Sequence, residues 1–544
     1  LLERAGLDPA DPRVQVLADV VDGLHQLPRH RGIHVGGFVL TREPLATVAA
    51  IEPASMPGRT VICWERDDLD YAGLVKIDLL GLGMLTVVQD CLAHVRRTRG
   101  TTIDLALPRL KPRCFYDLVV EVALIRPGPI QGEMVHPYLR RRAGEEPVVY
   151  PHPSLEPILK RTLGVPLFQE QGMQVELRRA MGHKRSAEKM EALRARMLGG
   201  MAKNGIAADV ADRIFAQLNA FADYGFPESH AASFALIVYA SAWLRHYYAP
   251  EFAAAILNAQ PMGFYSPGTL VEDARRHGVE VRPVDLTRSA WDATLERRVG
   301  TAAPALRLGV RSIRGLGAAA RGKLEAALAQ GAFRDVADVV QRTRLDRRAL
   351  RLLAEAGALD AMFPHEPVAT RRRRALWEVL AAVRGDAGPL APAAPRPDVA
   401  LPAMSPAALT DADYRVTGIS LVGHPLRHLR PLLVPNGIRT ARELFDAGVD
   451  GEPVGVAGLV ICRQRPGTAK GFVFLSLEDE TGIVNVVVTP QRFARDAEVI
   501  GRSPLLLVRG VLQVEGRVVT VRARRFARLD TDLALDHVRS HDYR

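Results

Sequence analysis

The residues with the clearest capacity for chemistry lie in the segment DYAGLVKIDLLGL, residues 70–82. If residues 73–80 form a β-strand, alternate side chains share a face, so Lys76 and Asp78 project together and Ile77 points to the opposite side. A carboxylate and an ammonium group in an apolar strand are costly to bury unless they are paired or used. The pattern therefore leaves two interpretations open, a structural ion pair or a functional site.

A second group of residues could hold phosphate. The run LRRAMGHKR, residues 177–185, contains four cationic side chains: Arg178, Arg179, Lys184 and Arg185. Guanidinium and ammonium groups suit phosphate oxygens, although a solvated helix end would have the same composition. His230 follows Ser229, a good helix N-cap, at a position where histidine is often only structural.

Four consecutive arginines, residues 371–374, stand at the start of a predicted helix and include Arg371 and Arg372. Such a run either lies against duplex phosphates or forms a basic patch that faces solvent. The sequence alone favours neither interpretation.

The elements that must position these residues follow from the hydrophobic periodicity. Residues 1–30 have a helical pattern, strands are predicted at 38–41, 59–64 and 73–80, and a helix is predicted over 84–97. Residues from about 110 to 260 are mostly helical, and the long helix that starts after Ser229 ends at Pro250.

Two later segments are recognisable by their glycines and prolines. Residues 306–328, LRLGVRSIRGLGAAARGKLEAAL, fit a helix-hairpin-helix pattern with Gly315 and Gly317 in the turn. Glycine removes the side chain there, so the turn amides can approach a DNA phosphate. Residues 386–412 are rich in Ala, Pro and Gly and predict a linker.

Five strands at barrel-like spacing are predicted at 454–462, 472–477, 484–489, 505–514 and 517–527. They favour a five-stranded OB barrel, an architecture that commonly binds single strands or oligosaccharides, although a purely structural barrel remains an alternative. Arg463, Arg509 and Arg517 are expected on or near one face, where they would suit a single-stranded template.

Composition sets the broad class. A chain of 544 residues is too long for one core, so several domains are expected, and the net charge of +11 favours a polyanionic partner. Four widely spaced cysteines indicate a reducing compartment. Because no membrane span or signal peptide is visible, we expect a cytoplasmic protein with no membrane partner. The first residue, Leu1, lies inside a helical pattern, so we expect a C-terminal fragment.

Several blocks together resemble the bacterial C family of DNA polymerases, the polymerase III alpha subunits and their relatives. LVKIDLLGLGMLT is similar to the strand that bears the family's third catalytic aspartate, and HVGGFVL, at 34–40, to its histidine-glycine-glycine palm element. IRPGPIQG at 125–132, LFQEQGMQV at 167–175 and the long block at 225–257 follow in the family's order. The resemblance covers almost the whole chain.

The resemblance implies a multidomain α+β fold with a partial nucleotidyltransferase-type palm, large helical fingers, a helix-hairpin-helix module and a C-terminal OB β-barrel. The implied division is as follows: 1–30 the end of a thumb, 31–85 the C-terminal part of the palm, 86–300 the fingers, 301–385 the hairpin and a following helical module, 386–435 a linker, 436–530 the OB-fold and 531–544 a tail.

It also implies the chemistry of phosphodiester synthesis. Two Mg²⁺ ions about 4 Å apart can stabilise the attacking and leaving oxygens, and an aspartate on a rigid strand is a suitable ligand. Asp78 is then expected to be catalytic and a metal ligand, and Lys76 to offset charge on the nucleotide. The cations of residues 178–185, with His230, are expected to bind the dNTP. The family's other two catalytic aspartates form an Asp-x-Asp motif, and no such pair in a strand precedes residue 34.

The ending at Arg544, a short tail after the last predicted strand, resembles the error-prone, damage-inducible branch of the family, as does DYRVTGISLVGHPLRHLRP at 413–431. The implied partners are primer-template DNA, dNTPs and a sliding clamp, the clamp being reached through a Y-family-like accessory protein. Two alternatives stay open: a truncated replicative alpha subunit, and a non-catalytic DNA-binding or scaffolding protein derived from a polymerase.

Overall fold

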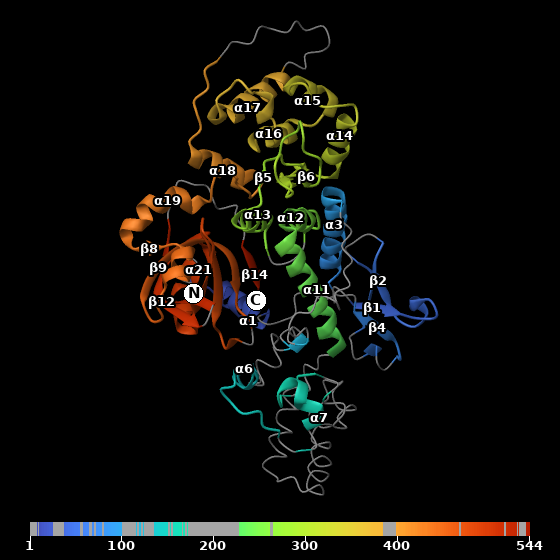
Figure 1. Ribbon diagram of the computed structural model, residues 1–544, viewed down its shortest axis with the longest axis vertical. Helices are drawn as coiled ribbons and strands as arrows, with labels where there is room; N and C mark the ends of the chain where they lie inside the picture. Colours follow the sequence, from blue (N-terminus) through green and yellow to red (C-terminus); the bar gives the residue numbers. More distant parts are fainter. Residues whose placement is uncertain are drawn as a thin grey trace. The chain divides into compact units, whose positions relative to one another are not determined.

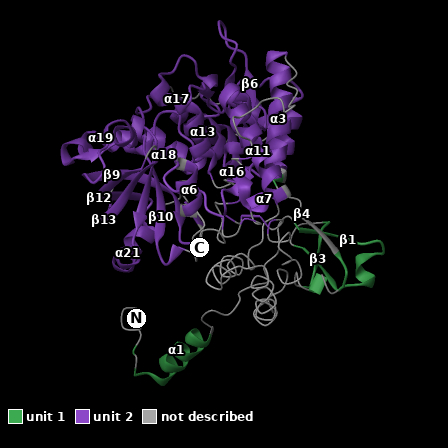
Figure 2. Ribbon diagram, turned by 60° about the horizontal axis from the view of Figure 1, so that its bottom comes forward, with its two compact units in different colours: residues 1–82, 182–186 green, residues 83–181, 187–544 purple. Residues whose placement is uncertain are grey.

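The computed structural model describes residues 8–24, 37–100, 135–165, 228–384, 399–529 and 540–543, with short gaps inside these ranges, and a few single residues elsewhere. The chain divides into two compact units (Figure 2). Unit 1 comprises residues 1–82 and 182–186, and unit 2 comprises residues 83–181 and 187–544.

The main elements of the described part of unit 1 are a helix and two small antiparallel sheets. Its elements are α1 (Pro12–Leu24), β1 (Gly37–Leu40), the 3-10 turn η2 (Leu45–Thr47), β2 (Ile51–Pro53), β3 (Thr60–Ile62) and β4 (Val75–Asp78). Strand β1 pairs with β4, and β2 pairs with β3. The predicted strands at 38–41, 59–64 and 73–80 are therefore confirmed. The first is shifted by one residue, and the other two are shorter than predicted.

The first part of unit 2 is helical. Its elements are α3 (Leu82–Arg99), α6 (Val135–Ala143), α7 (Glu156–Leu159), the 3-10 turn η4 (Lys160–Thr162) and α11 (Glu228–Tyr247). Val87, Cys91 and Val95 of α3 pack with Leu244 of α11. The α3 helix is also fixed by Glu251, a fully buried carboxylate that accepts hydrogen bonds from Arg99 Nε at 2.7 Å and Thr98 Oγ1 at 3.0 Å.

The largest core joins segments that the sequence had placed in different domains. It runs from Ala253 to Ile419 and takes in α12 (Ala249–Asn258), α13 (Pro267–Arg276), the small sheet β5 (Val281–Arg282), β6 (Thr294–Glu296) and β7 (Ala305–Arg307), and the helices that follow. These are η5 (Val310–Ser312), α14 (Ala318–Leu328), α15 (Val336–Thr343), α16 (Arg347–Glu355), η6 (Asp360–Met362) and α17 (Val368–Arg384). Because α12 shares this core, the compact hairpin module begins before residue 300, where the sequence interpretation had ended the fingers.

The linker predicted over 386–435 is wrong for its second half. Residues 385–398 lie outside the described part, but α18 (Pro406–Val416) and α19 (Pro425–Leu433) are regular helices. Ser405 caps α18 by accepting a hydrogen bond from the Ala408 amide, and Tyr414 and Leu426 are buried against the barrel. The prolines of this segment were interpreted as a sign of a linker. Two of them instead occupy the first turn of α18 and of α19, where proline is favoured.

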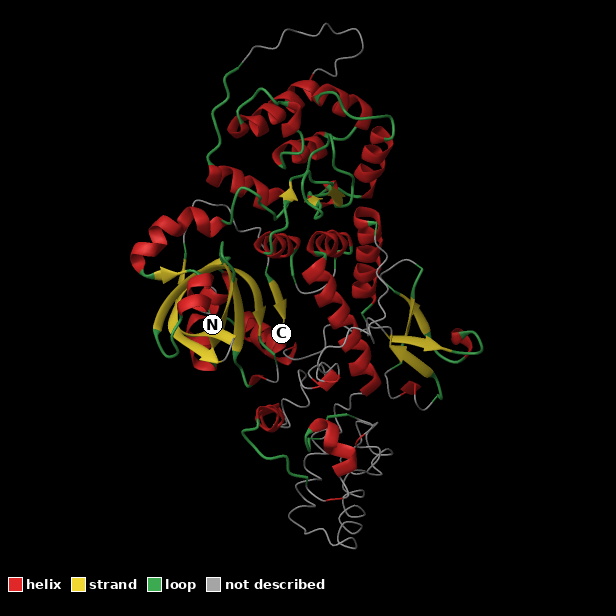
Figure 3. Ribbon diagram, in the orientation of Figure 1, coloured by secondary structure: helices red, strands yellow, loops and turns green. Residues whose placement is uncertain are grey.

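The C-terminal part is a five-stranded barrel that closes through the pairing of β9 with both β10 and β12 (Figure 1, Figure 3). Its strands are β9 (Pro453–Gln464), β10 (Val473–Glu478), β11 (Ile483–Val488), β12 (Leu505–Glu515) and β13 (Val518–Arg528), and they pair in the cyclic order β9, β10, β11, β13, β12. Buried residues alternate approximately with more exposed ones along β10, β11, β12 and β13, whereas residues 454–461 of β9 are all buried.

Four elements of the barrel region were not predicted. Helix α21 (Pro490–Arg502) connects β11 to β12 and contacts β13, while β8 (Ile438–Arg439) and α20 (Ala441–Ala447) precede the first barrel strand. The expected tail also contains a short strand, β14 (His541–Tyr543), which pairs in parallel with β9.

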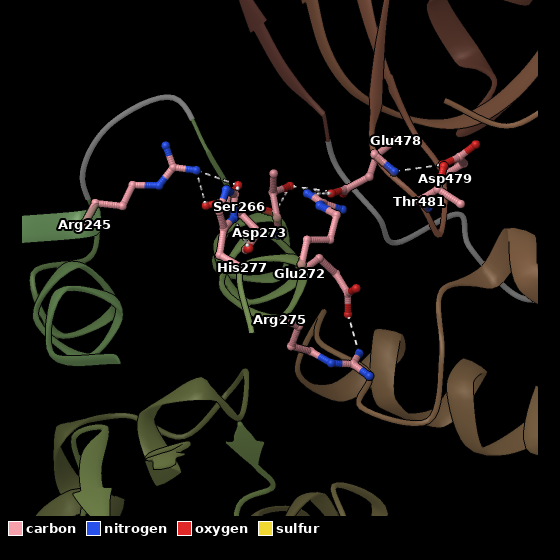
Figure 4. Close-up of polar contacts among 12 residues, drawn as sticks. Arg245, Ser266, Glu272, Asp273, Arg275, His277, Glu478, Asp479 and Thr481 are labelled. Atoms are coloured by element: carbon pink, nitrogen blue, oxygen red, sulfur yellow. Dashed lines mark hydrogen bonds and ion pairs between the residues drawn. The ribbon is translucent and has the colours of Figure 1, made fainter. Parts of the chain in front are cut away.

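Helix α13 connects the helical module to the barrel (Figure 4). Arg276 at its C-terminal end forms an ion pair of 3.1 Å with Glu478 of β10, and Thr269 Oγ1 donates to the same carboxylate at 3.4 Å. On the other side, Arg245 of α11 makes two hydrogen bonds to Asp273. Burial raises the pKa of Glu478 to about 7, although the positive charge of Arg276 acts to lower it.

A buried histidine lies in the same region. His424, the N-cap of α19, is almost fully buried, and its Nδ1 accepts a hydrogen bond from the Leu426 amide at 3.2 Å. Burial, with the nearby Arg276 and Arg430, lowers its pKa to about 3. The imidazole is therefore neutral at physiological pH.

Candidate active site and nucleic-acid interface

The predicted catalytic residues lie on strand β4. In the antiparallel pair of β1 and β4, Asp78 is opposite Gly37 and Lys76 is opposite Val39. Gly73 and Gly81, both with positive φ, bracket the strand. The side chains of Lys76 and Asp78 lie outside the described part of the structure, so their assignment as catalytic residues stays a prediction.

The donor chemistry of Asp78 fits Mg²⁺, which prefers carboxylate oxygens. Within the described residues, no three His, Cys, Asp or Glu side chains come together as a metal site. The structure therefore gives no metal geometry, and Asp78 is the one candidate ligand that the sequence analysis named.

The predicted nucleotide-binding cations, Arg178, Arg179, Lys184 and Arg185, lie outside the described residues. His230 is described, in the first turn of α11, where it is partly buried and makes an edge-to-face contact with Phe234, with ring centroids 5.2 Å apart. This contact fits the structural interpretation of His230 as well as the nucleotide-binding one.

Beside His230, a polar cluster fixes the start of α11. Tyr116 Oη donates to Glu228 at 2.7 Å, Arg161 lies over the Tyr116 ring at 4.5 Å, and Arg161 also pairs with Glu228 at 3.8 Å. Tyr116, Arg161 and Glu228 are far apart in the chain, so no sequence pattern indicated that they lie together.

Gln171 is a second residue that the sequence analysis missed. Its buried Oε1 accepts from the Leu167 and Phe168 amides at 2.8 and 3.0 Å, and its Nε2 donates to Thr162 at 2.9 Å and to the Ile158 carbonyl. All of its hydrogen-bonding capacity is used within the protein, so Gln171 holds the backbone of Leu167 and Phe168 in place and has no group left for a ligand.

The hairpin turn has the backbone that its glycines predicted. Gly315 has φ of +88°, which side chains other than glycine rarely adopt, and Gly317 is the N-cap of α14. A Cβ at Gly317 would meet no atom within 4 Å, so the amides at the start of α14 are open to approach. The first helix of the motif is a single 3-10 turn, η5, shorter than expected.

The four arginines of α17 are used within the protein. Arg371 donates to the carbonyls of Glu366 and Pro364, and Arg372 pairs with Asp413 at 2.8 Å. Arg373 and Arg374 donate to the carbonyls of Pro402 and Val399. The contacts of Arg372, Arg373 and Arg374 hold residues 399–413 against α17. The DNA-binding role of Arg371 and Arg372 stays a prediction.

The three barrel arginines that were predicted to bind DNA differ in their surroundings. Arg463 is largely buried and donates to the carbonyls of Ile500 and Ser503, which commits it to the barrel. Arg509 is exposed on β12, with a 3.2 Å hydrogen bond to the Asn436 carbonyl, and Arg517 lies outside the described residues.

A larger basic surface was missed on β13. Arg509 is directly opposite Arg525, and β13 adds further exposed arginines at Arg522, Arg524 and Arg528. The run VRARRFAR, residues 521–528, contains four arginines in a predicted strand and was the signal that could have identified this surface.

Models of known families match four parts of the chain. The bacterial DNA polymerase III alpha NTPase domain matches residues 2–81 and the finger domain of the same subunit matches 99–205. A helix-hairpin-helix motif matches 278–372, and an OB-fold nucleic acid binding domain matches 454–529. The chain belongs to the C family of bacterial DNA polymerases, to which the polymerase III alpha subunits belong.

Within this family the chain is similar to the error-prone branch. It is 50% identical to an error-prone DNA polymerase of Anaeromyxobacter dehalogenans strain 2CP-1, over 96% of the chain and 50% of the relative. Error-prone DNA polymerases of Pseudomonas fluorescens Pf0-1 and Pseudomonas aeruginosa are each 44% identical over the whole chain, which covers 57% and 56% of their lengths. The chain thus spans about half the length of the curated relatives it matches.

Proposed function

We propose that this chain is part of an error-prone DNA-directed DNA polymerase that adds dNTPs to a primer 3′ end during DNA damage tolerance, that is, translesion synthesis. The observation that carries the proposal is the identity of 42–50% to error-prone DNA polymerases over 96–100% of the chain. The folded hairpin and barrel, both matched by nucleic-acid-binding families, support DNA as the partner.

In this proposal Asp78 positions the reacting end of the primer, as a ligand to Mg²⁺ or through the attacking hydroxyl. Mg²⁺, when bound, offsets the charge that develops on the attacking and leaving oxygens. Lys76, two residues earlier on the same strand, offsets charge on the nucleotide. A rigid strand suits both roles, because small displacements of a catalytic group are costly.

The remaining side chains bind and orient the substrates. Arg178, Arg179, Lys184, Arg185 and His230 are proposed to bind the triphosphate of the dNTP. The amides around Gly315 and Gly317 hold a phosphate of the primer-template, and the exposed arginines of β12 and β13 follow the single-stranded template.

We further propose a cytoplasmic location and access to the sliding clamp through a Y-family-like accessory protein. None of the described helices is long and apolar enough to cross a membrane.

The test is single-nucleotide incorporation on a labelled primer-template with Mg²⁺. The 544-residue chain should bind the DNA without extending it, because it supplies one of the family's three catalytic aspartates. A protein that also carries the Asp-x-Asp strand should extend the primer. If that longer protein binds DNA but never extends it, the second candidate, a non-catalytic DNA-binding protein, is the better description; the complete hairpin and barrel are what favour it.

A further inference from the structure

An exposed cluster of aromatic rings lies at the C-terminal end of α11. The Tyr247 side chain is 59% exposed, and its ring centroid lies 4.6 Å from that of His246 and 5.0 Å from that of Trp243. Trp243 is in turn 5.6 Å from Tyr248, and both pack against the core that α3, α11 and α12 share. Tyr247 is therefore an exposed ring whose neighbours are anchored in the protein.

The last turn of α3 places cations beside this cluster. Arg99 lies over the Tyr248 ring at 5.6 Å, and Arg96 and Arg97, in the same helical turn, are both exposed. Arg97 Nη2 is 2.9 Å from His94 Nδ1. Within the described residues, neither Arg96 nor Arg97 forms an ion pair, so both charges face solvent.

The carboxylates described around the cluster are mostly paired. Glu251 is fully buried and pairs with Arg99 at 2.7 Å, and Asp273 pairs with Arg245 at 2.7 Å. Asp90, earlier in α3, adds one negative charge. The two exposed arginines outnumber it, so the local charge is positive and suits a polyanion.

We propose that this surface binds a single-stranded nucleic acid, with one base stacked on Tyr247 and the adjoining phosphates at Arg96 and Arg97. Every base has a flat π face, so an exposed aromatic ring beside cations can hold a strand without reading its sequence. An apolar segment of another protein would use the ring but would gain little from the arginines.

Helix α13 connects this end of α11 to the barrel (Figure 4). On one side, Asp273 of α13 accepts two hydrogen bonds from Arg245; on the other, the same helix forms the ion pair with Glu478 of β10. The inference deepens the proposed function, and it rests on that function for DNA as the ligand. It adds a contact for the single strand that belongs neither to the barrel nor to the hairpin.

Another exposed ring provides a matched control. Phe445 of α20 is 50% exposed, but the exposed carboxylates of Glu443 and Asp446 flank it. A phosphate next to a base stacked on Phe445 would meet negative charge. Phe445→Leu should therefore leave binding of a single strand unchanged.

The test measures binding of the whole chain to a labelled oligo-dT strand by fluorescence anisotropy. Tyr247→Leu keeps an apolar side chain but removes the ring, so it should weaken binding about tenfold. Tyr247→Phe keeps the ring and should bind as the parent does. In parallel, a strand that carries 5-iodouracil, which photocrosslinks to a ring stacked on it, should crosslink at residue 247 in the parent and in Tyr247→Phe but not in Tyr247→Leu.

The phosphate contact is tested by salt. Arg96→Gln should weaken binding and reduce the slope of log affinity against log salt by roughly 0.7, the value for one phosphate on a single strand. Arg502→Gln, at an exposed arginine of α21, should leave the slope unchanged.

Loss of affinity and of the crosslink in Tyr247→Leu, with both retained in Tyr247→Phe and Phe445→Leu, supports the site. The inference is overturned if the parent binds the strand and Tyr247→Leu, shown to be folded by its melting curve, binds it equally well. That result leaves the proposed function intact and favours an apolar segment of another protein as the partner of Tyr247. A parent chain that binds no single strand would instead count against both the inference and the proposed role of the barrel.

Discussion

Asp360 is a largely buried carboxylate whose Oδ1 has no hydrogen-bond partner within the described residues, so its charge should have a measurable folding cost. Burial raises its pKa from 3.8 to about 6, with Asp413 and Asp285 adding to the shift and Arg372 and Arg371 opposing it. The folded state therefore holds the proton more tightly than the unfolded state, and the stability that this gives is present at low pH and lost as the pH rises from about 4 to 6.

Asp360→Asn cannot ionise, so it should not lose this stability as the pH rises. At pH 8 the variant should be more stable than the parent by about 1–3 kcal/mol, and at pH 4 the two should be nearly equal. Urea denaturation at both pH values measures the difference, with Asp446→Asn as the exposed control. A variant that is less stable at pH 8 would mean that Asp360 is paired and charged in the folded protein.

At the scale of elements, the hairpin turn offers a matched pair of glycines on α14 and its N-cap. Neither Gly317 nor Gly322 has an atom within 4 Å of an added Cβ, so alanine at either position should fold. Gly317→Ala should weaken binding to duplex DNA several-fold, because its methyl group stands where a phosphate approaches the helix amides. Gly322→Ala, within the helix, should leave binding unchanged. Equal affinities for the two variants would remove the hairpin from the DNA interface.

The exposed arginines of β13 give the second prediction for an element. Replacing Arg522, Arg524 and Arg525 with glutamine should weaken binding of single-stranded DNA and reduce the slope of log affinity against log salt by roughly 0.7 for each phosphate that is no longer neutralised. Arg502→Gln, on the exposed side of α21, is the control with the same type of charge change. An unchanged salt slope in the triple variant, measured by anisotropy from low to moderate salt, would place the DNA elsewhere.

Elements that depend on neighbouring residues in the sequence were predicted well, and contacts between distant residues were not. The five barrel strands were predicted to within about two residues, because a short apolar run, alternating in four of the strands and continuous in β9, is a local feature of the sequence. Helices α18 and α19 were missed, because Pro and Ala at a helix start resemble a linker. The intramolecular partners of Arg371 and Arg372 could not be predicted, because no sequence pattern shows the carbonyls and the Asp413 carboxylate that they bind.

At the scale of the whole molecule, the contact between α13 and the barrel should make stability depend on pH. Burial raises the pKa of Glu478 from 4.5 to about 7; Arg276 opposes this shift and Glu272 adds to it. The free energy of unfolding should therefore fall as the pH rises between these two values. The pKa of His424 is lowered from 6.5 to about 3, so this residue should make the free energy of unfolding rise as the pH rises from 3 to 6.5. Glu478→Gln should therefore leave a stability that rises with pH over about 4.5 to 6.5.

Thermal unfolding across that pH range measures this change, and Glu498→Gln, at an exposed carboxylate, is the control. If Glu478→Gln and the parent show parallel curves, the Glu478 charge is fully offset by Arg276 and the junction is insensitive to pH.

The central claim is that strand β4 carries a catalytic carboxylate of a C-family DNA polymerase. The most direct measurement is single-turnover nucleotide incorporation by a protein that joins this chain to the family's Asp-x-Asp strand, compared with its Asp78→Ala variant at equal DNA occupancy. Asp19→Ala, at an exposed residue of α1, serves as the control. We predict that Asp78→Ala binds primer-template normally but loses incorporation by at least about 100-fold, as expected for removal of a group that acts on the transition state. Incorporation at the parental rate by Asp78→Ala would contradict the account, and would assign Lys76 and Asp78 to a structural ion pair.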